Sequence, residues 1–371
     1  MKKALIWLLL LSLLVCLNPT AEAQSDWVWE RKMELEYATC FQVDYYQGGY
    51  KLITLLDGSR FLTVPEGAPV PEGAPKDAAV LRQPIENIYL AATSAMCLFD
   101  ALDRLDAIAL SGSRAESWYV ENARIAMEEG RILFGGKYNQ PDYELLLSSH
   151  TSLAVESMMI GHASDVSRKL QELGITVLMD QSSMEEHPLG RTEWMKLYAA
   201  LLNEEGKAEA LFREQARLLE QLSEERAPET TVAFFHISSA GYAVVRKSGD
   251  YVTKMLELAG GKYVFQDLGD PETRTSTVNL EMERFYQAAR DADCVIYNST
   301  IGGELRTLEQ LLEKSPLLAD FKAVRSGNVW CTQKNMYQET TQLGQMIQSF
   351  QMILSGQAAE LTELPFLYRL S

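Results

Sequence analysis

The strongest constraint on the fold is a single long amphipathic segment between two regions in which strands alternate with helices. From residue 192 to residue 225, apolar side chains recur at helical spacing and keep one face apolar. At about 1.5 Å per residue, an unbroken helix of this length would reach roughly 45–50 Å, which is more than one compact lobe needs. The segment therefore predicts one helix that connects two separate units.

Strands and helices alternate on both sides of this segment, which is typical of a parallel sheet covered by helices. Before it we expect strands at 78–84, 106–112, 152–157 and 175–181, with helices at 87–105 and 163–174. After it we expect a strand at 230–239, a helix at 251–261, a helix and a strand within 285–300, and a strand at 327–332. The sequence thus predicts an α/β fold of two Rossmann-like lobes, 78–190 and 228–371, joined by a helix over 191–227.

Residues 24–77 follow a different pattern from the two lobes. Residues 50–64 predict two strands around Asp57 and Gly58, a dipeptide that is typical of tight β-hairpin turns. The Pro- and Gly-rich residues 65–75 cannot form a helix and predict a linker. We therefore expect an N-terminal β-hairpin extension and a linker ahead of the first lobe.

The first 23 residues predict an export signal. Lys2 and Lys3 precede a short apolar run, and Ala-Glu-Ala before Gln24 has the small-x-small pattern of a cleavage site. The alternative is lipidation at Cys16, where the preceding Val15 is larger than the residue usually found before a lipidated cysteine. Both alternatives predict an exported protein in the periplasm or at the cell surface.

The composition of the chain argues against nucleic acid as a partner and against a metal site. The formal net charge is −17, so nucleic acid is not an expected partner, because nucleic-acid binding needs a basic surface. Neither the cysteines nor the four histidines have the spacing of a metal site or of a disulfide framework. We expect no metal site and no cofactor, and we expect Cys97 and Cys294, which lie in apolar runs, to be small core residues.

Three stretches of the chain resemble a known family. They are "YELLLSSHTSLAVES" at 143–157, "LGRTEWMK" at 189–196 and "ERFYQAARDADCVIYNS" at 283–299. Over about residues 78–350 the chain resembles the substrate-binding proteins of ABC importers for ferric siderophores, haem and cobalamin. The resemblance implies a class III periplasmic-binding-protein fold and a function without catalysis. Such a protein captures a small-molecule ligand between its lobes and delivers it to a membrane permease.

The resemblance leaves the ligand open. The family has Pro-Asp before two of its strands, where this chain has Thr-Ser and Ala-Asp, and the N-terminal hairpin lies outside the family pattern. We rank a ferric siderophore first, with cobalamin and haem next. The alternative is a secreted, chelatase-like enzyme that processes a metal chelate. Against it, the chain has no G-x-S-x-G, P-loop or H-E-x-x-H motif.

Ligands of open α/β sheets bind beyond the carboxyl ends of the strands, so the segments that follow the strands supply the candidate ligand-binding residues. Arg191 is added because the start of the connecting helix lies beside the expected cleft. Aromatic rings and guanidinium groups suit a chelate with flat apolar faces and an anionic edge. The candidates are Arg82, Tyr89, Ser111, Trp118, Ser157, Met158, Ser182, Arg191, Ser238, Tyr242, Arg246, Asn298 and Tyr337.

Two acidic residues are candidates for a different role. In the family, one acidic residue on each lobe contacts arginines of the permease, and the resemblance implies Glu144 and Glu283 for this docking. Glu281 competes with Glu283 for the second position. The alternative is that these side chains only stabilise helix N-termini through the helix dipole.

Overall fold

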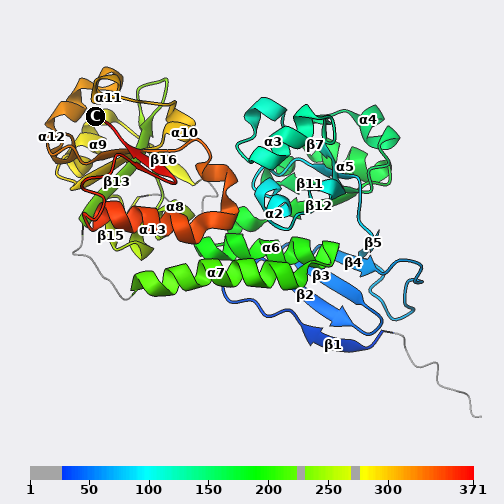
Figure 1. The fold of residues 1–371 in the computed structure, drawn as a ribbon. Coiled ribbons are helices and arrows are strands. Elements are labelled where there is room, and N and C mark those ends of the chain that lie inside the picture. Colours follow the sequence, from blue (N-terminus) through cyan, green and yellow to red (C-terminus); the bar gives the residue numbers. More distant parts are fainter. Residues whose placement is uncertain (1–26, 224–229, 269–275) are drawn as a thin grey trace, which may run out of the picture.

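The computed structural model describes residues 27–223, 230–268 and 276–371. Two α/β lobes stand side by side above a pair of helices, and a third, all-β unit lies against those helices (Figure 1). The two-lobe fold predicted from the alternation of strands and helices is confirmed. The predicted export signal, residues 1–23, and Cys16 lie outside the described residues.

The first lobe is built on a five-stranded sheet in the order β12-β11-β6-β7-β8, in which all neighbouring strands are parallel. Alternate residues of β11 enter separate hydrophobic cores on the two faces of the sheet, as buried parallel sheets require. The strands are β6 (Ile88–Leu90), β7 (Ile108–Ser111), β8 (Leu133–Phe134), β11 (Leu153–Ser157) and β12 (Thr176–Asp180); β9 (Gly136–Lys137) and β10 (Gln140–Pro141) form a separate ladder. The helices are α2 (Met96–Ala101), α3 (Glu121–Glu128), α4 (Tyr143–Ser148) and α5 (Ser164–Glu172).

The helix predicted over residues 87–105 is wrong in its first part. Ile88–Leu90 forms β6, the central strand of the sheet, and the helix α2 begins only at Met96. All three side chains of β6 are buried. A short apolar run that is buried on both faces lacks the alternation that distinguishes a strand from a helix.

The second lobe has a mixed sheet in which β13, β17 and β18 are parallel and the outer strands are mainly antiparallel. The strands are β13 (Thr230–Ile237), β14 (Ala243–Arg246), β15 (Gly261–Tyr263), β16 (Thr277–Leu280), β17 (Cys294–Tyr297), β18 (Val329–Thr332), β19 (Glu363–Leu364) and β20 (Leu367–Arg369). The helices are α8 (Tyr251–Leu258), α9 (Met282–Ala289), α10 (Ser299–Gly302), α11 (Leu308–Lys314), α12 (Lys322–Arg325) and α13 (Leu343–Leu354).

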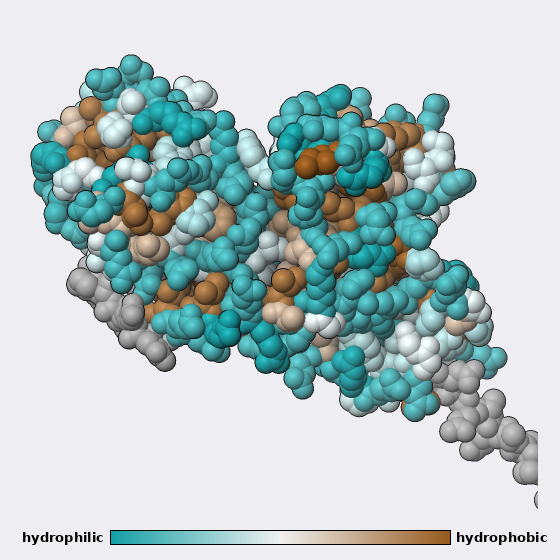
Figure 2. Space-filling view, in the orientation of Figure 1, coloured by the Kyte–Doolittle hydropathy of each residue, from teal (hydrophilic) through white to brown (hydrophobic). Residues whose placement is uncertain are grey.

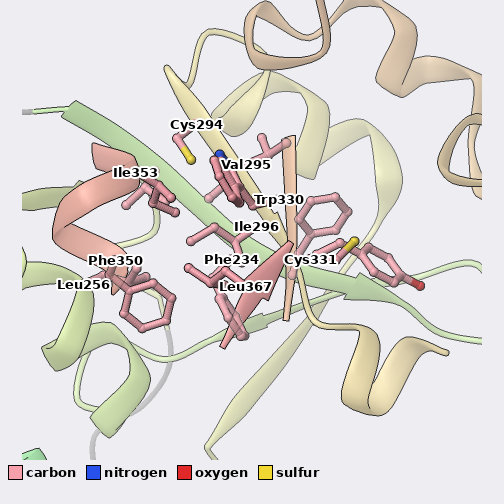
Figure 3. Packing of buried hydrophobic residues seen from close by; sticks show 14 of the residues in the cluster. Phe234, Leu256, Cys294, Val295, Ile296, Trp330, Cys331, Phe350, Ile353 and Leu367 are labelled. Atoms are coloured by element: carbon pink, nitrogen blue, oxygen red, sulfur yellow. The ribbon is translucent and has the colours of Figure 1, made fainter. Parts of the chain in front are cut away.

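The parallel strands carry the core of the second lobe. Figure 3 shows Phe234, Ile296 and Trp330 of these strands packed near Phe350 and Ile353 of α13. The four cysteines of the described residues are free and buried, so the prediction of Cys97 and Cys294 as core residues is confirmed. Burial raises the pKa of the Cys331 thiol to about 12, so this side chain is protonated and packs as a small apolar group.

The all-β unit is larger than the predicted hairpin. Its sheet has the order β1-β2-β3-β4-β5, with β1 (Trp29–Lys32), β2 (Phe41–Tyr46), β3 (Tyr50–Leu55), β4 (Arg60–Val64) and β5 (Ala79–Arg82). The β3–β4 hairpin at Gly58, whose φ of 84° suits glycine, is confirmed. The boundary at residue 78 is wrong, because β5 pairs in parallel with β4 instead of joining the first lobe. The linker residues 65–75 lie between these two paired strands.

The predicted continuous helix over residues 191–227 is also wrong. The structure has two helices, α6 (Pro188–Leu202) and α7 (Glu205–Ser223), which pack side by side (Figure 1). Between them Asn203 adopts a left-handed conformation with φ 61°, which ends α6, and asparagine tolerates this conformation better than most residues. Among the described residues, the chain leads from α6 toward the second lobe through α7, which packs against α6 and against α13 of the second lobe.

A short connection between β1 and β2, residues 34–40, ties the all-β unit to α6, and we call it the strap. Five successive backbone N–H groups, those of residues 36–40, donate hydrogen bonds of 2.8–3.2 Å to two carboxylates. Glu193 accepts the first three and Glu185 the last two. Both carboxylates are buried and need donors, and the strap supplies N–H groups that are buried at Ala38 and Cys40 and partly buried at residues 36, 37 and 39.

A second attachment lies at the other end of α6. The ammonium group of Lys51, on β3, donates to the carbonyl oxygen of Ala200 at 2.8 Å and to the side-chain oxygen of Asn203 at 2.7 Å. It also forms an ion pair of 2.5 Å with Glu205 at the start of α7. The all-β unit is thus fixed at both ends of α6.

Glu156 on β11 is a buried carboxyl group without a partner. It is 0% exposed, and neither of its oxygens has a hydrogen-bond partner among the described residues. Burial raises its pKa from 4.5 to about 8, because the ionised form loses its hydration inside the lobe. At neutral pH the folded protein therefore holds Glu156 mainly as a neutral acid.

Glu156→Gln should stabilise the protein in a pH-dependent way. Between pH 4.5 and about 8 the carboxyl group is ionised in the unfolded chain and protonated in the folded one, so its penalty grows as the pH rises. We expect the variant to be more stable than the wild type by on the order of 3 kcal/mol at pH 8, and by little at pH 4.5. Denaturant unfolding at both pH values measures this, with the exposed Glu144→Gln as the control. An equal gain in the free energy of unfolding at both pH values would contradict the raised pKa of Glu156.

Candidate ligand site between the lobes

Three predicted residues of the second lobe meet in one hydrogen-bonded cluster. The guanidinium of Arg246, at the end of β14, donates to the hydroxyl of Tyr337, and the amide of Asn298 donates to the same hydroxyl at 2.9 Å. Arg246 also lies 3.4 Å from the carboxylate of Asp250, which caps the N-terminus of α8. The cluster is a buried wall around one guanidinium, which is paired with one carboxylate; we call it the cationic wall after that guanidinium.

Arg191 reaches this cluster from the first turn of α6. Its guanidinium carbon lies 3.6 Å from the centre of the Tyr251 ring at the start of α8, a stacked cation–π contact. One terminal nitrogen donates to the carbonyl oxygen of Ser183 at 2.7 Å. Arg191 therefore bridges a segment of the first lobe and a helix of the second, as predicted for a residue at the cleft.

Two atoms of this region carry an unused hydrogen-bonding capacity. The side-chain oxygen of Asn298 and the Nε of Arg191 are both buried and have no partner in the described part of the chain. Buried polar atoms are nearly always paired, so a bound group or water that both accepts and donates suits this place. The two arginines supply the charge for an anionic group.

The lobes touch directly through two sets of hydrogen bonds. The side-chain amide of Gln338 accepts a hydrogen bond from the backbone of Tyr119 and donates one to the carbonyl oxygen of Ser117, each at 2.8 Å. The hydroxyl of Thr192 on α6 donates to the carbonyl oxygen of Thr340 at 2.8 Å. Figure 2 shows the surface hollowed between the two lobes.

Large apolar side chains are exposed in the segments that follow strands of both lobes, and we call them the apolar rim. They are between 37% and 58% exposed, although side chains of this size are usually buried. All follow the carboxyl ends of parallel strands, which is where α/β sheets bind ligands. The rim consists of Tyr119, Met159, Met184, Tyr242 and Ile301.

Several other predicted residues lie at these strand ends. Ser157 caps the turn after β11 by accepting a hydrogen bond from the backbone of Met159, and the neighbouring Met158 is half-buried. Ser238 follows β13 and accepts a hydrogen bond from the backbone of Tyr242 at 3.1 Å. These residues have the positions that the sequence predicted, and their contact with a ligand stays a prediction.

Five predicted residues are placed differently. Tyr89 is fully buried and donates to the carbonyl oxygen of Gly136. The indole of Trp118 donates to the hydroxyl of Ser111, and both side chains are buried inside the first lobe. Ser182 is buried as well, and Arg82 belongs to the all-β unit, where it binds the carbonyl oxygen of Ala68. These side chains were predicted from strand ends alone, which do not reveal the direction of a side chain.

The structure adds residues that the sequence analysis missed. Asp250 is signalled only by its place before the amphipathic helix α8, and Gln338 has no sequence signal for its contact across the lobes. His236 on β13 is half-buried, and burial followed by the charge of Arg246 lowers its pKa. Its imidazole is therefore neutral at neutral pH beside a cationic wall.

The two docking candidates lie on outer helices. Glu144 is exposed in the first turn of α4, and Glu283 is exposed in the first turn of α9. Figure 1 shows α4 and α9 toward the top of the two lobes, whereas α7 runs along the bottom. Glu281 is exposed directly before α9 and makes no capping hydrogen bond. The positions suit an outward-facing role, which stays a prediction.

A separate cavity of about 770 Å³ lies on the all-β unit. It is lined by the strap and by the ends of β2 and β3, with Lys32, Glu34 and Glu36 mixed among apolar side chains. None of its lining residues has an unpartnered buried polar side-chain atom. Its lining comes from the all-β unit and includes none of the candidate ligand-binding residues, so we do not assign it as the candidate ligand site.

Two further properties apply to residues 27–223, 230–268 and 276–371. No group of three or more His, Cys, Asp and Glu side chains among them is placed to hold a metal ion. Nor do these residues include a helix with the length and apolar composition needed to cross a bilayer.

Gln338→Ala should separate the lobes. The change removes both side-chain hydrogen bonds to the loop at residues 117–119, so we expect a larger radius of gyration in small-angle scattering than for the wild type. Gln342→Ala is the matched control, because Gln342 bonds only Glu339 within the same segment. Identical scattering profiles for the two variants would show that Gln338 does not hold the lobes together.

Comparisons with known proteins agree with this architecture. The periplasmic binding protein family matches residues 117–336, more than half of the chain. An uncharacterized lipoprotein of Methanocaldococcus jannaschii is 26% identical over 302 residues, covering 78% of this chain and 70% of that protein.

A periplasmic binding protein of Veillonella parvula has a TM-score of 0.62 at 16% identity, covering 85% of this chain and 98% of that one. The periplasmic haem-binding protein HutB of Vibrio cholerae has a TM-score of 0.58 at 19% identity, covering 71% of this chain and 98% of that one. With two α/β lobes joined through α7, the chain belongs to the periplasmic binding protein family and has its class III substrate-binding fold.

Proposed function

We propose that this protein is the extracytoplasmic substrate-binding component of an ABC importer and captures a metal chelate between its lobes. The observation that carries the proposal is that Arg191 and Arg246 both lie close to Tyr251, while exposed apolar side chains follow the strand ends of both lobes. Guanidinium groups bind anionic oxygens, and exposed aromatic and aliphatic side chains bind apolar faces. A bulky chelate with both features fits this combination.

The apolar rim favours a chelate that has flat apolar faces. The family resemblance alone ranks a ferric siderophore first, but rings such as those of Tyr119 and Tyr242 gain most from contact with a flat apolar ligand. Haem has two such faces and carboxylates at one edge, and the similar protein of Vibrio cholerae is a haem-binding protein. We therefore place haem first, a corrinoid next and a ferric siderophore third.

Export and delivery complete the proposal. The predicted signal peptide places the mature protein outside the cytoplasm, and the similarity to a lipoprotein supports the alternative of an anchor at Cys16. Glu144 and Glu283 are exposed on different lobes and would each pair with a basic residue of the permease. Two such contacts would align each lobe with one subunit of a two-subunit permease.

Purified protein can be screened with ferric haem, cyanocobalamin and a ferric tris-catecholate siderophore. A ligand that binds only the folded state raises the thermal midpoint, and we expect ferric haem to do so and to shift its own Soret band. Arg191→Ala should weaken haem binding by about ten-fold or more, because a charge-assisted contact is lost. Arg168→Ala, which removes an exposed arginine of α5, is the control. Turnover of a bound chelate, or no stabilisation by any of the three, would overturn the proposal.

Docking and ligand binding should be separable. Glu144→Ala and Glu283→Ala should leave haem affinity of the purified protein unchanged and reduce haem uptake by cells that carry the importer. Glu172→Ala, which removes an exposed glutamate of α5, is the control for a change of surface charge. Weaker haem binding by the Glu144 variant in a calorimetric titration would contradict the docking role.

A further inference from the structure

The first two turns of α6 are held between the strap and the second lobe. On one side, Glu185 and Glu193 accept the N–H groups of residues 36–40. On the other side, Arg191 stacks on Tyr251 and Thr192 bonds the backbone of Thr340, both in the second lobe. In the sequence, Glu185 and Glu193, which face the strap, therefore lie on either side of Arg191, which faces the candidate site.

The contact between α6 and the strap is close as well as polar. A Cβ atom at Gly190 would lie 3.2 Å from the carboxylate of Glu185 and 3.2 Å from the carbonyl oxygen of Tyr37. The ring of Tyr37 stacks on that of His187, with centroids 4.3 Å apart. The indole of Trp194 donates to Glu185 at 2.8 Å, so the carboxylate links the strap to the helix core. Little room is left for the start of α6 to move toward the strap.

Arg191 depends on this arrangement more than on its own contacts. Its guanidinium has one hydrogen bond, to Ser183, and its buried Nε has no partner in the described residues. A long side chain with one hydrogen bond and one stacked ring keeps its direction only if its backbone is fixed. The backbone on both sides of Arg191 is fixed by the carboxylates that bind the strap.

We propose that the strap is a positioning device for the ligand site. Glu185 and Glu193 hold the start of α6 between the strap and the second lobe, and Arg191 is thereby aimed at the anionic edge of the chelate. The all-β unit, which lies outside the matched family region, then acts as a brace for binding. The predicted effect on affinity rests on the proposed function, whereas the effect on Arg191 itself does not.

Glu185→Gln tests the proposal, because the amide replaces an acceptor with a donor that faces the N–H groups of the strap. Glu205→Gln is the matched control: it weakens the attachment of the same sheet to the same helix pair, at the far end of α6. Nitrogen-15 NMR of arginine-labelled protein without ligand reports the hydrogen exchange of the Arg191 Nε–H. We expect faster exchange in Glu185→Gln and unchanged exchange in Glu205→Gln.

Titration with ferric haem gives the second readout. Glu185→Gln should weaken haem binding by about five- to ten-fold, the effect of one misaligned charge-assisted hydrogen bond, and Glu205→Gln should not. In the Arg191→Ala background Glu185→Gln should have no further effect, since both changes remove the same contact. Gly190→Ala is the second variant if Glu185→Gln fails to fold. It removes no hydrogen-bonding group, uses a better helix former and pushes α6 from the strap.

The outcomes separate this proposal from the function on which its affinity arm rests. Equal Arg191 Nε–H exchange in Glu185→Gln and Glu205→Gln would overturn the positioning role. An undiminished effect of Glu185→Gln on haem binding in the Arg191→Ala background would overturn it too. A wild-type protein that binds no haem would overturn the haem assignment alone, and the NMR measurement would still decide the role of the strap.

Discussion

The two carboxylates of Glu185 and Glu193 make the contact on which the arrangement of the rest depends. They accept five successive backbone N–H groups of the strap, and they do so from within the interior of the protein. A buried carboxylate without donors is very unfavourable, and amides that are buried or partly buried also need acceptors. Because each side satisfies the other, the all-β unit and α6 form one body.

A second contact of the all-β unit lies where the connection between the lobes breaks into two helices. After α6 the chain reverses at Asn203, whose side chain is held by Lys51 and Gln83 of the all-β unit. The all-β unit thus binds the start of α6 through the strap and its end through Lys51. With α6 fixed in this way, the chain leads through α7 toward the second lobe, and the candidate site lies where α6 faces the second lobe.

The candidate site is asymmetric in its chemistry. The second lobe supplies the buried wall of Arg246, Asn298 and Tyr337, and α6 supplies Arg191. Both lobes contribute to the apolar rim. Arginines close to Tyr251 and apolar side chains near the strand ends would orient a ligand with one anionic edge, because each part of such a ligand meets its own kind of surface.

Periodicity in the sequence was sufficient for the two lobes and for the β3–β4 hairpin, because these depend on local pattern. It was insufficient where a choice depended on distant partners. The apolar run at Ile88–Leu90 became a strand because two cores enclose it, and β5 joined the all-β sheet because β4 offered it an edge. Tyr89 and Trp118 turned inward for the same kind of reason. The sequence by itself determined the class of fold and the kinds of side chain available to a ligand. Only the tertiary structure decided which of these side chains lie together, because residues more than a hundred positions apart set their burial and their hydrogen-bond partners. The hydrogen bonds between Glu193 and the strap are one example.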